Sequence, residues 1–356
     1  MSPFGSRPVI GLDLGSHTLK VIEAVRSGGG LRLTRVGLAQ TPPRAVTEGV
    51  AAGSEALAAA IRDLLANAGI RGNRVVTALG GEAVIIREMK LPEMPEAELA
   101  HAVAYEAERY LPPGGRDVIR DFQVLGPAPE AGQLEILLVA ARKEFVDRQL
   151  AALRASGLST AILDVAPFSA LRAIGGNGQA TDPMLYLDIG AESSDIVIID
   201  GGRPRLVRNI TVGGNALTNA IAEALDLEFA DAERLKEQHG RLFPEGQKLA
   251  DATSAHVHDA ILPVINDVLA EVCRSLDYHQ ARVRDAAVAK VVLTGGTAKL
   301  RGLVAFMSEA LGLPVEIADP FATLQAGGAF SPKFLHEVGP VMAVAVGLAL
   351  KERKVR

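Results

Sequence analysis

The sequence contains no tryptophan, a single cysteine and few aromatic residues. Tyr and Phe together make up 4% of its 356 residues, so its hydrophobic cores must be built mainly from Ala, Leu, Val and Ile. The single cysteine, Cys273, excludes an intramolecular disulfide, which is typical of a reducing cytoplasm. Because Cys273 has no Cys or His partner at ligand spacing, we expect it to be a small buried apolar residue.

The sequence also lacks an excess of one charge. It has 42 acidic and 37 basic residues and a net charge of −5. The only Lys/Arg-rich block is the short tail at residues 351–356, which is expected to be solvated, so the composition does not favour nucleic-acid binding. With 48% hydrophobic and 22% charged residues, the chain is typical of a folded soluble protein, and its length predicts two or three domains.

No hydrophobic run is long enough to span a membrane. The longest late apolar stretch covers 13 residues, 338–350, and includes Pro340, whereas about 20 residues are needed. It predicts a buried helix near 340–350. The first apolar run, residues 9–12, is followed by Asp13 and by no cleavage pattern, so no signal peptide is expected.

The order of predicted elements indicates an α/β chain with two related halves. A strand over 9–14, a turn and a strand over 19–25 open the chain, and a second such hairpin covers 184–200. The elements between and after the hairpins are strands 74–79 and 84–90, helix 96–110, strands 121–125 and 134–141, helix 143–156, a helical region 215–284, strand 288–294 and helix 300–311. The α-β-β-α block from 96 to 156 predicts an inserted subdomain.

Each hairpin begins with an apolar strand that ends in Asp-x-Gly, at Asp13 and Gly15 and again at Asp188 and Gly190. One match is typical of a plain turn, but two matches in separate halves indicate a duplicated fold. A tight turn without bulky side chains lets backbone N–H groups face phosphate oxygens. The two carboxylates, if paired, can hold a hydrated Mg²⁺ that bridges to phosphate. Lys20 either adds a cation to this cradle or is a surface lysine.

Three further segments suit a nucleotide, each with an ordinary structural alternative. Gly213-Gly214 stands at a helix start, where amides can face phosphate. Glu233 and Lys236 share one helix face, which either reaches a ribose and base or faces solvent. Gly295-Gly296-Thr297 connects a strand to a helix and leaves room for a flat adenosine, or is an ordinary loop.

Other chemistries find little support. His256 and His258, with His279 nearby, do not share a helix face at i,i+2 spacing, so we interpret them as structural or surface histidines. The sequence has neither a Gly-x-Ser-x-Gly nucleophile elbow nor a phosphate-binding loop of the Gly-x-x-x-x-Gly-Lys-Ser/Thr type.

The order of these motifs resembles the superfamily of actin, heat-shock chaperones and sugar kinases, and the inserted block resembles that of its FtsA branch. Within this branch the chain is similar to the PilM family of cytoplasmic actin-like proteins of type IV pilus assembly. The segments that carry this resemblance are KLPEMP at 90–95, EAERYLP at 106–112, DFQVLG at 121–126, LVAAR at 138–142 and RSLDY at 274–278.

The resemblance implies an actin-like ATPase fold, which consists of duplicated ribonuclease-H-like domains with an inserted α+β subdomain in the first half. Residues 1–88 and 160–182 would form the first actin-like subdomain, and 89–159 the insert. Residues 183–225 and 286–356 would form the second actin-like subdomain, and 226–285 a helical subdomain on the nucleotide side.

The resemblance also implies ATP and Mg²⁺ as ligands, with Asp13 and Asp188 at the metal. The implied nucleotide-binding residues are Asp13, Gly15, Ser16, His17, Thr18, Lys20, Asp188, Gly190, Ser194, Gly213, Gly214, Glu233, Lys236, Gly295, Gly296 and Thr297. His17 stands where members of the family often have a small residue, and Ser194 stands where they often have Thr. Ala166 stands where relatives often carry a carboxylate that positions water, which puts hydrolysis more than binding in question, so no catalytic residue is assigned.

The partner implied by the resemblance is the N-terminal cytoplasmic tail of the membrane protein PilN, held in a groove beside the insert. Through PilN the chain would reach PilO and the pilus motor and platform, as a cytoplasmic protein peripheral at the inner membrane and without inserting into it. Self-association is left open. The alternatives are a small-molecule kinase of the same superfamily and a filament-forming membrane tether like FtsA, although neither a substrate motif nor an amphipathic helix after Leu350 supports them.

Overall fold

The structure is a computed structural model that describes residues 8–28, 30–110, 117–175, 182–243, 251–282, 287–327 and 329–351. Parts of the 106–112 motif, of the helical region 215–284 and of the C-terminal tail lie outside these residues.

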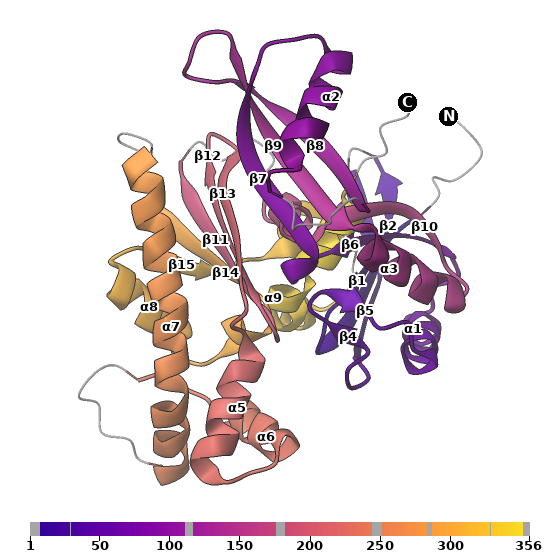
Figure 1. Cartoon of the computed structure of the whole chain (residues 1–356). Helices are drawn as coiled ribbons and strands as arrows, with labels where there is room; N and C mark the ends of the chain where they lie inside the picture. The colour runs from indigo at the N-terminus through magenta and orange to yellow at the C-terminus, as the bar shows by residue number, and fades with distance from the viewer. Residues whose placement is uncertain are drawn as a thin grey trace.

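Two β-sheets with the same strand order form the frame of the molecule (Figure 1). The first runs in the order β10 (Ser159–Val165), β6 (Arg74–Leu79), β1 (Val9–Leu14), β2 (Thr18–Ser27), β3 (Gly30–Gln40) and the short β16 (Gln325–Ala326). The second runs in the order β15 (Val315–Ile317), β14 (Lys290–Thr294), β11 (Met184–Ile189), β12 (Ser194–Asp200) and β13 (Arg203–Ile210). In each sheet the first hairpin is antiparallel and the next two strands join in parallel. The predicted α/β duplication is therefore confirmed.

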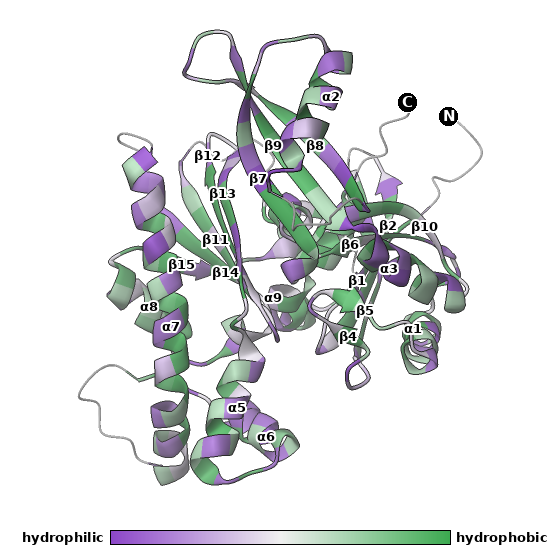
Figure 2. Ribbon diagram, viewed as in Figure 1, coloured by the Kyte–Doolittle hydropathy of each residue, from purple (hydrophilic) through white to green (hydrophobic). Residues whose placement is uncertain are grey.

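We call the first sheet and its helices the first lobe. These helices are α1 (Glu55–Asn67), α3 (Lys143–Ala155), α4 (Ala166–Ala173) and α9 (Pro332–Ala349), and the two-stranded ribbon β4 (Val46–Thr47) and β5 (Val50–Ala51) lies beside α3. Helix α1 begins where the sequence offers a cap, because the Ser54 hydroxyl accepts the N–H of Leu57 at 3.2 Å. The helices cover apolar strand faces, and Figure 2 shows these strands as hydrophobic.

Helix α9 is longer than predicted. It begins at Pro332 rather than near residue 340, because Ser331 caps it by accepting the N–H of Phe334 at 3.2 Å and Pro332 suits a first helical turn. The helix packs on α4 and β1. Helices α9 and α4 lie so close together that a Cβ on Gly347 of α9 would be 1.6 Å from the Ser169 carbonyl oxygen of α4. Glycine is therefore required at this position.

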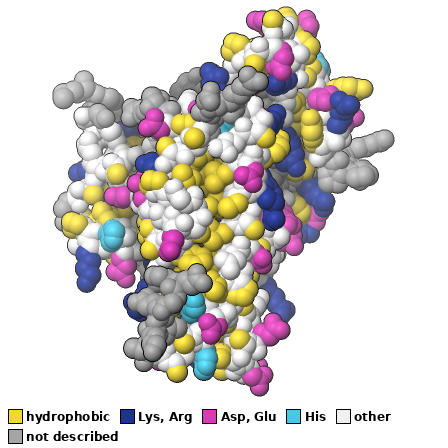
Figure 3. All heavy atoms as spheres, turned by 90° about the vertical axis from the view of Figure 1, so that its left-hand side faces the viewer, with side chains coloured by type: hydrophobic (Ala, Val, Ile, Leu, Met, Phe, Trp, Pro, Cys, Tyr) yellow, Lys and Arg dark blue, Asp and Glu magenta, His cyan; other side chains and the backbone are white. Residues whose placement is uncertain are grey.

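We call the second sheet and its helices the second lobe. The helices are α5 (Gly214–Leu225), α6 (Phe229–His239), α7 (Ala252–Arg282) and α8 (Leu303–Leu311). Leu187, Ile196, Ile261 and Leu293 lie in a core cluster shared by the sheet and α7. Figure 3 shows the face on the side of α7 and α8, where hydrophobic side chains gather in the middle.

The prediction for Cys273 was wrong, because this residue is exposed on α7. The buried positions of that helix include Val272, Ser275 and His279, so Cys273 is turned about 100° away from Val272 on the buried face.

Among the residues that the structure describes, none of the helices is long and apolar enough to cross a membrane.

The insert sheet consists of β7 (Val84–Pro92), β9 (Gln133–Arg142) and β8 (Val118–Pro127), in that order, with α2 (Glu96–Ala107) on one face. Leu99 and Val103 of α2 lie in one cluster with Ile136 and Leu138 of β9. The sheet is joined to the second lobe by an ion pair between Glu135 and Arg205, at 2.8 Å.

The predicted insert, residues 89–159, differs from these elements at both ends. Strand β7 begins before residue 89, and helix α3, which lies within the predicted range, contacts α1 and β5 of the first lobe. The subdomain boundaries stay a prediction.

Candidate nucleotide-binding site

A cleft of about 710 Å³ separates the two lobes and is lined by both hairpins, by α6 and by the loop after β14. This size suits a small ligand or cofactor. The predicted residues that line it are Asp13, Gly15, Ser16, His17, Thr18, Lys20, Asp188, Gly190, Gly214, Glu233, Lys236, Gly295, Gly296 and Thr297. The fold therefore gathers residues from five separate segments at one cleft.

The first hairpin places a cation beside its carboxylate. Asp13 and Lys20 face each other across β1 and β2, and their Oδ2 and Nζ atoms are 2.9 Å apart. A Cβ on Gly15 would lie 2.8 Å from the Thr18 carbonyl oxygen, so the turn needs glycine. Thr41 holds the turn from β3's end, since its N–H donates to the His17 carbonyl at 2.9 Å. Lys20 is thus a cleft cation rather than a surface lysine.

The second hairpin has the same strand register as the first, but two carboxylates face each other where the first hairpin has a carboxylate and a lysine. Asp188 faces Asp195 across β11 and β12, where the first hairpin has Asp13 and Lys20. Burial raises the pKa of Asp195 to about 7 despite a hydrogen bond from Asn209 Nδ2 at 2.8 Å. Asp195 lines the cleft but was not predicted, although its spacing from Asp188 equals that between Asp13 and Lys20.

Asp188 is held by a buried chain of hydroxyl groups. The Tyr186 hydroxyl donates to Asp188 Oδ2 at 3.0 Å and accepts from Thr294 Oγ1 at 2.8 Å. Burial raises the pKa of Asp188, while Lys20 lowers it and Asp13 raises it. Burial disfavours the charged form of each carboxyl group, and a nearby cation would favour it.

These carboxylates fit a divalent cation. Asp13, Asp188 and Asp195 all line the cleft with Lys20, and Mg²⁺ prefers oxygen ligands from one or two carboxylates together with phosphate and water. Such an ion would offset the desolvation that raises the pKa values of Asp188 and Asp195. Asp13 and Asp188 are the two that the sequence predicted for it.

Two predicted residues, Ser194 and Gly213, are not among those lining the cleft. The Ser194 hydroxyl donates to the Val212 carbonyl at 2.6 Å, and a Cβ on Gly213 would lie 2.7 Å from the Gly190 carbonyl oxygen. The Gly214 N–H also donates to that oxygen, at 2.8 Å. This junction fixes the second hairpin against the start of α5, so the Gly214 N–H is already engaged by protein.

The face of helix α6 that carries Glu233 and Lys236 is turned to the cleft rather than to open solvent. Lys236 Nζ contacts Glu233 Oε2 at 2.7 Å, Thr218 Oγ1 at 2.7 Å and the Gly214 carbonyl at 2.9 Å. The side chains of Glu233 and Lys236 are 17% and 14% exposed. A carboxylate held in this way can accept hydrogen bonds from ribose hydroxyls.

The loop after β14 requires glycine at one position. Gly295 has a φ of +89°, and a Cβ there would lie 2.3 Å from the Ile189 carbonyl oxygen. Its N–H donates to the Pro340 carbonyl of α9 at 2.7 Å, which ties the loop to that helix. The following turn, η2 (Gly296–Lys299), then exposes Gly296 and Thr297 to the cleft.

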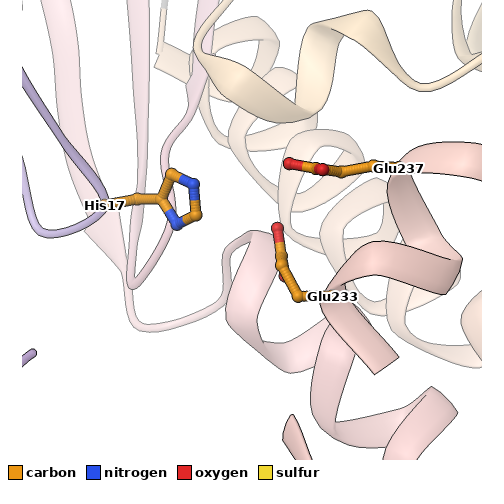
Figure 4. A group of neighbouring side chains, drawn as sticks. All are labelled: His17, Glu233 and Glu237. Carbon is orange, nitrogen blue, oxygen red and sulfur yellow. The ribbon is translucent and has the colours of Figure 1, made fainter. Parts of the chain in front are cut away.

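One further group in the cleft was not predicted. His17 of the first hairpin and Glu233 and Glu237 of α6 offer ligand atoms that all lie within 4.8 Å of one another, and Figure 4 shows the three side chains pointing toward one another. Glu237 follows Glu233 by one helical turn, and this spacing was the available sequence signal.

The duplicated sheets, the insert in the first half and the cleft between two Asp-x-Gly hairpins define the class of actin-like proteins. A family model described as type IV pilus assembly protein PilM matches residues 11–353. The chain therefore belongs to the PilM family of type IV pilus assembly proteins.

Known structures and relatives agree with this placement. A solved structure titled "PilM-PilN type IV pilus biogenesis complex" contains a chain 36% identical to this one, with 96% of this chain and 97% of that chain covered and a TM-score of 0.85. MreB 5 of Spiroplasma citri bound to AMPPNP is 16% identical with a TM-score of 0.54, covering 97% and 95%. FtsA of Neisseria meningitidis serogroup B is 23% identical over 87% of this chain and 83% of its own length. The latter two show the fold alone.

Proposed function

We propose that this chain is a nucleotide-binding scaffold of type IV pilus assembly that holds the N-terminal cytoplasmic tail of a PilN membrane protein. The observation that carries the proposal is the 36% identity and TM-score of 0.85 to a chain of a PilM–PilN complex, over 96% of this chain. Through PilN, the protein would be peripheral at the inner membrane and connected to PilO and the pilus platform.

The insert supports the proposed place of the peptide. Its strand β8 lies at the edge of a three-stranded sheet and carries the exposed apolar side chains of Ile119 and Val124, while Tyr105 of α2 is 75% exposed. Exposed apolar side chains beside a sheet edge suit an extended peptide. These exposed side chains support a peptide groove beside the insert.

The cleft supports ATP with Mg²⁺ as the ligand. Asp13 and Asp188 would hold the ion, the two hairpins the phosphates, Glu233 the ribose and residues 295–297 the adenosine. Mg²⁺, when bound, supplies positive charge beside the phosphates. Ala166 lines the cleft at the start of α4 and offers no carboxylate to orient water, so binding rather than rapid hydrolysis is the expected activity.

Nucleotide binding is tested by calorimetry with and without Mg²⁺. We expect wild-type protein to bind MgATP and Asp188→Asn, which keeps the side-chain shape but removes the charge, to bind at least about tenfold more weakly, in line with the loss of a charged contact. Glu98→Gln, an exposed residue of α2, is the matched control. Equal affinity in Asp188→Asn would place the nucleotide elsewhere.

The partner is tested by titrating a labelled peptide of the PilN cytoplasmic tail into the full chain, with a scrambled peptide of equal composition as the control. Saturable binding of the native peptide alone is expected. Saturating MgATP should change that affinity, since a ligand shifts a conformational equilibrium only by binding one state better. Absence of saturable binding would contradict the proposed partner, whatever the nucleotide result.

A further inference from the structure

We propose that His17, Glu233 and Glu237 form a transition-metal site that joins the two lobes across the cleft. His17 lies in the turn of the first-lobe hairpin, and both glutamates lie on α6 of the second lobe (Figure 4). An ion bound by all three would hold the lobes together. The chemical class is a borderline divalent cation such as Zn²⁺.

The donor set selects this class of ion. One imidazole nitrogen and two carboxylates suit Zn²⁺, Co²⁺ or Ni²⁺, whereas Mg²⁺ prefers oxygen alone. Three protein ligands leave a fourth position of a tetrahedral ion open to water or another small ligand. This site is therefore chemically distinct from the carboxylates Asp13, Asp188 and Asp195 that line the same cleft.

The backbone under each ligand is held in place. The His17 carbonyl accepts the Thr41 N–H at 2.9 Å, which fixes the turn that presents the imidazole. On α6, Lys236 bonds to the Gly214 carbonyl and to Thr218, and so ties the helix to α5. Glu233 Oε2 accepts from Lys236 and Thr218, so Oε1 is the oxygen that Glu233 offers to an ion.

The distances require only side-chain movement. The ligand atoms lie within 4.8 Å of one another, and two ligands of one tetrahedral Zn²⁺ are about 3.3 Å apart, given bonds of about 2.0 Å. Glu237 is exposed and His17 is at least partly exposed, so their rotamers can change at little cost. The two glutamates are one helical turn apart and already share a face.

The site has a consequence for nucleotide binding. Glu233 is also the residue proposed above for the ribose, so an ion on Glu233 would exclude nucleotide and nucleotide would release the ion. This competition rests on the proposed ATP site, whereas metal binding itself does not. A direct metal titration therefore separates failure of the metal site from failure of the ATP site.

The test uses the full chain, treated with chelator and free of nucleotide, titrated with Co²⁺ and then with Zn²⁺. The visible absorption of Co²⁺ reports its nitrogen and oxygen ligands without any enzymatic activity. We expect one Co²⁺ per chain that Zn²⁺ displaces and excess Mg²⁺ does not, and at least about tenfold weaker binding of that ion in His17→Ala and in Glu237→Gln, as for loss of a ligand. His256→Ala, at an exposed histidine of α7, should bind as wild type does.

Two results would overturn the site. Equal Co²⁺ binding in His17→Ala and wild type would assign the metal to other residues. If the wild-type chain gives no saturable Co²⁺ absorption, the three side chains do not bind an ion. Circular dichroism of each variant establishes that the fold is retained. If Co²⁺ binds as expected but MgATP does not displace it, the metal site stands and the shared role of Glu233 is wrong.

Discussion

At the scale of single residues, burial raises the pKa of several carboxyl groups. Glu88 on β7 is such a group outside the cleft. Burial raises its pKa to about 7, and this effect outweighs the opposing influence of Arg282 and Arg205. In the unfolded chain the pKa of Glu88 would be near the ordinary value of 4.5. The folded state therefore binds a proton on the Glu88 carboxyl group more tightly than the unfolded state does.

The pH dependence follows from that difference. The stabilising contribution of the Glu88 proton is fully present below pH 4.5 and is lost as pH rises to about 7. Glu88→Gln should therefore raise the free energy of unfolding at pH 8 by about 1–2 kcal/mol, after allowance for partial exposure, and change it little at pH 5. Urea denaturation at both pH values measures this, with Glu98→Gln as the control. An equal effect at both pH values would contradict the assigned cause.

At the scale of elements, the contact between α9 and α4 depends on one glycine of α9. A Cβ on Gly347 would lie 1.6 Å from the Ser169 carbonyl oxygen, whereas a Cβ on Gly339 of the same helix would have its nearest neighbour, Pro320 Cδ, at 3.6 Å. The first distance forces the two helices apart, and the second is an ordinary contact. The two positions therefore form a matched pair within one helix.

Opposite effects are expected from the same substitution at these two positions. Gly347→Ala should lower the free energy of unfolding by about 2–3 kcal/mol, the usual cost of overpacking a core. Gly339→Ala should raise it by about 0.5–1 kcal/mol, because alanine favours a helix interior. Thermal denaturation of both variants checks this. A stable Gly347→Ala protein would show that α9 can shift away from α4 without loss.

At the scale of the whole molecule, the two lobes meet around a cleft whose lining comes from both. A nucleotide that contacts both hairpins should favour the closed arrangement. Saturating MgATP is expected to lower the radius of gyration in X-ray scattering, and at about 100 times the dissociation constant to add about 2.7 kcal/mol of stability. At the same MgATP concentration, Asp188→Asn should gain no more than about 1.4 kcal/mol, because its binding is at least about tenfold weaker. Added stability with an unchanged radius would mean that binding leaves the lobe angle as it is.

Much of the fold could be predicted because its signals are short in range. Apolar runs that end in Asp-x-Gly predicted both hairpins. The resemblance then placed the hairpins at one cleft, and the structure agrees for Asp13, Lys20, Asp188, Glu233 and Gly295, among others. The start of α9 differs from the prediction because the helix begins at the Ser331 cap, ahead of the apolar run at 338–350.

What the sequence by itself determined is therefore the set of local elements, their duplicated order and most of the site residues expected at the cleft, 14 of which line it. Only the tertiary structure decided which side chains meet across it, because these contacts depend on how the two lobes pack. His17 meets Glu237 only because the lobes lie side by side, whereas Asp195 opposes Asp188 within one hairpin through strand register. Cys273 is exposed because a step of one residue along α7 turns its side chain away from the core.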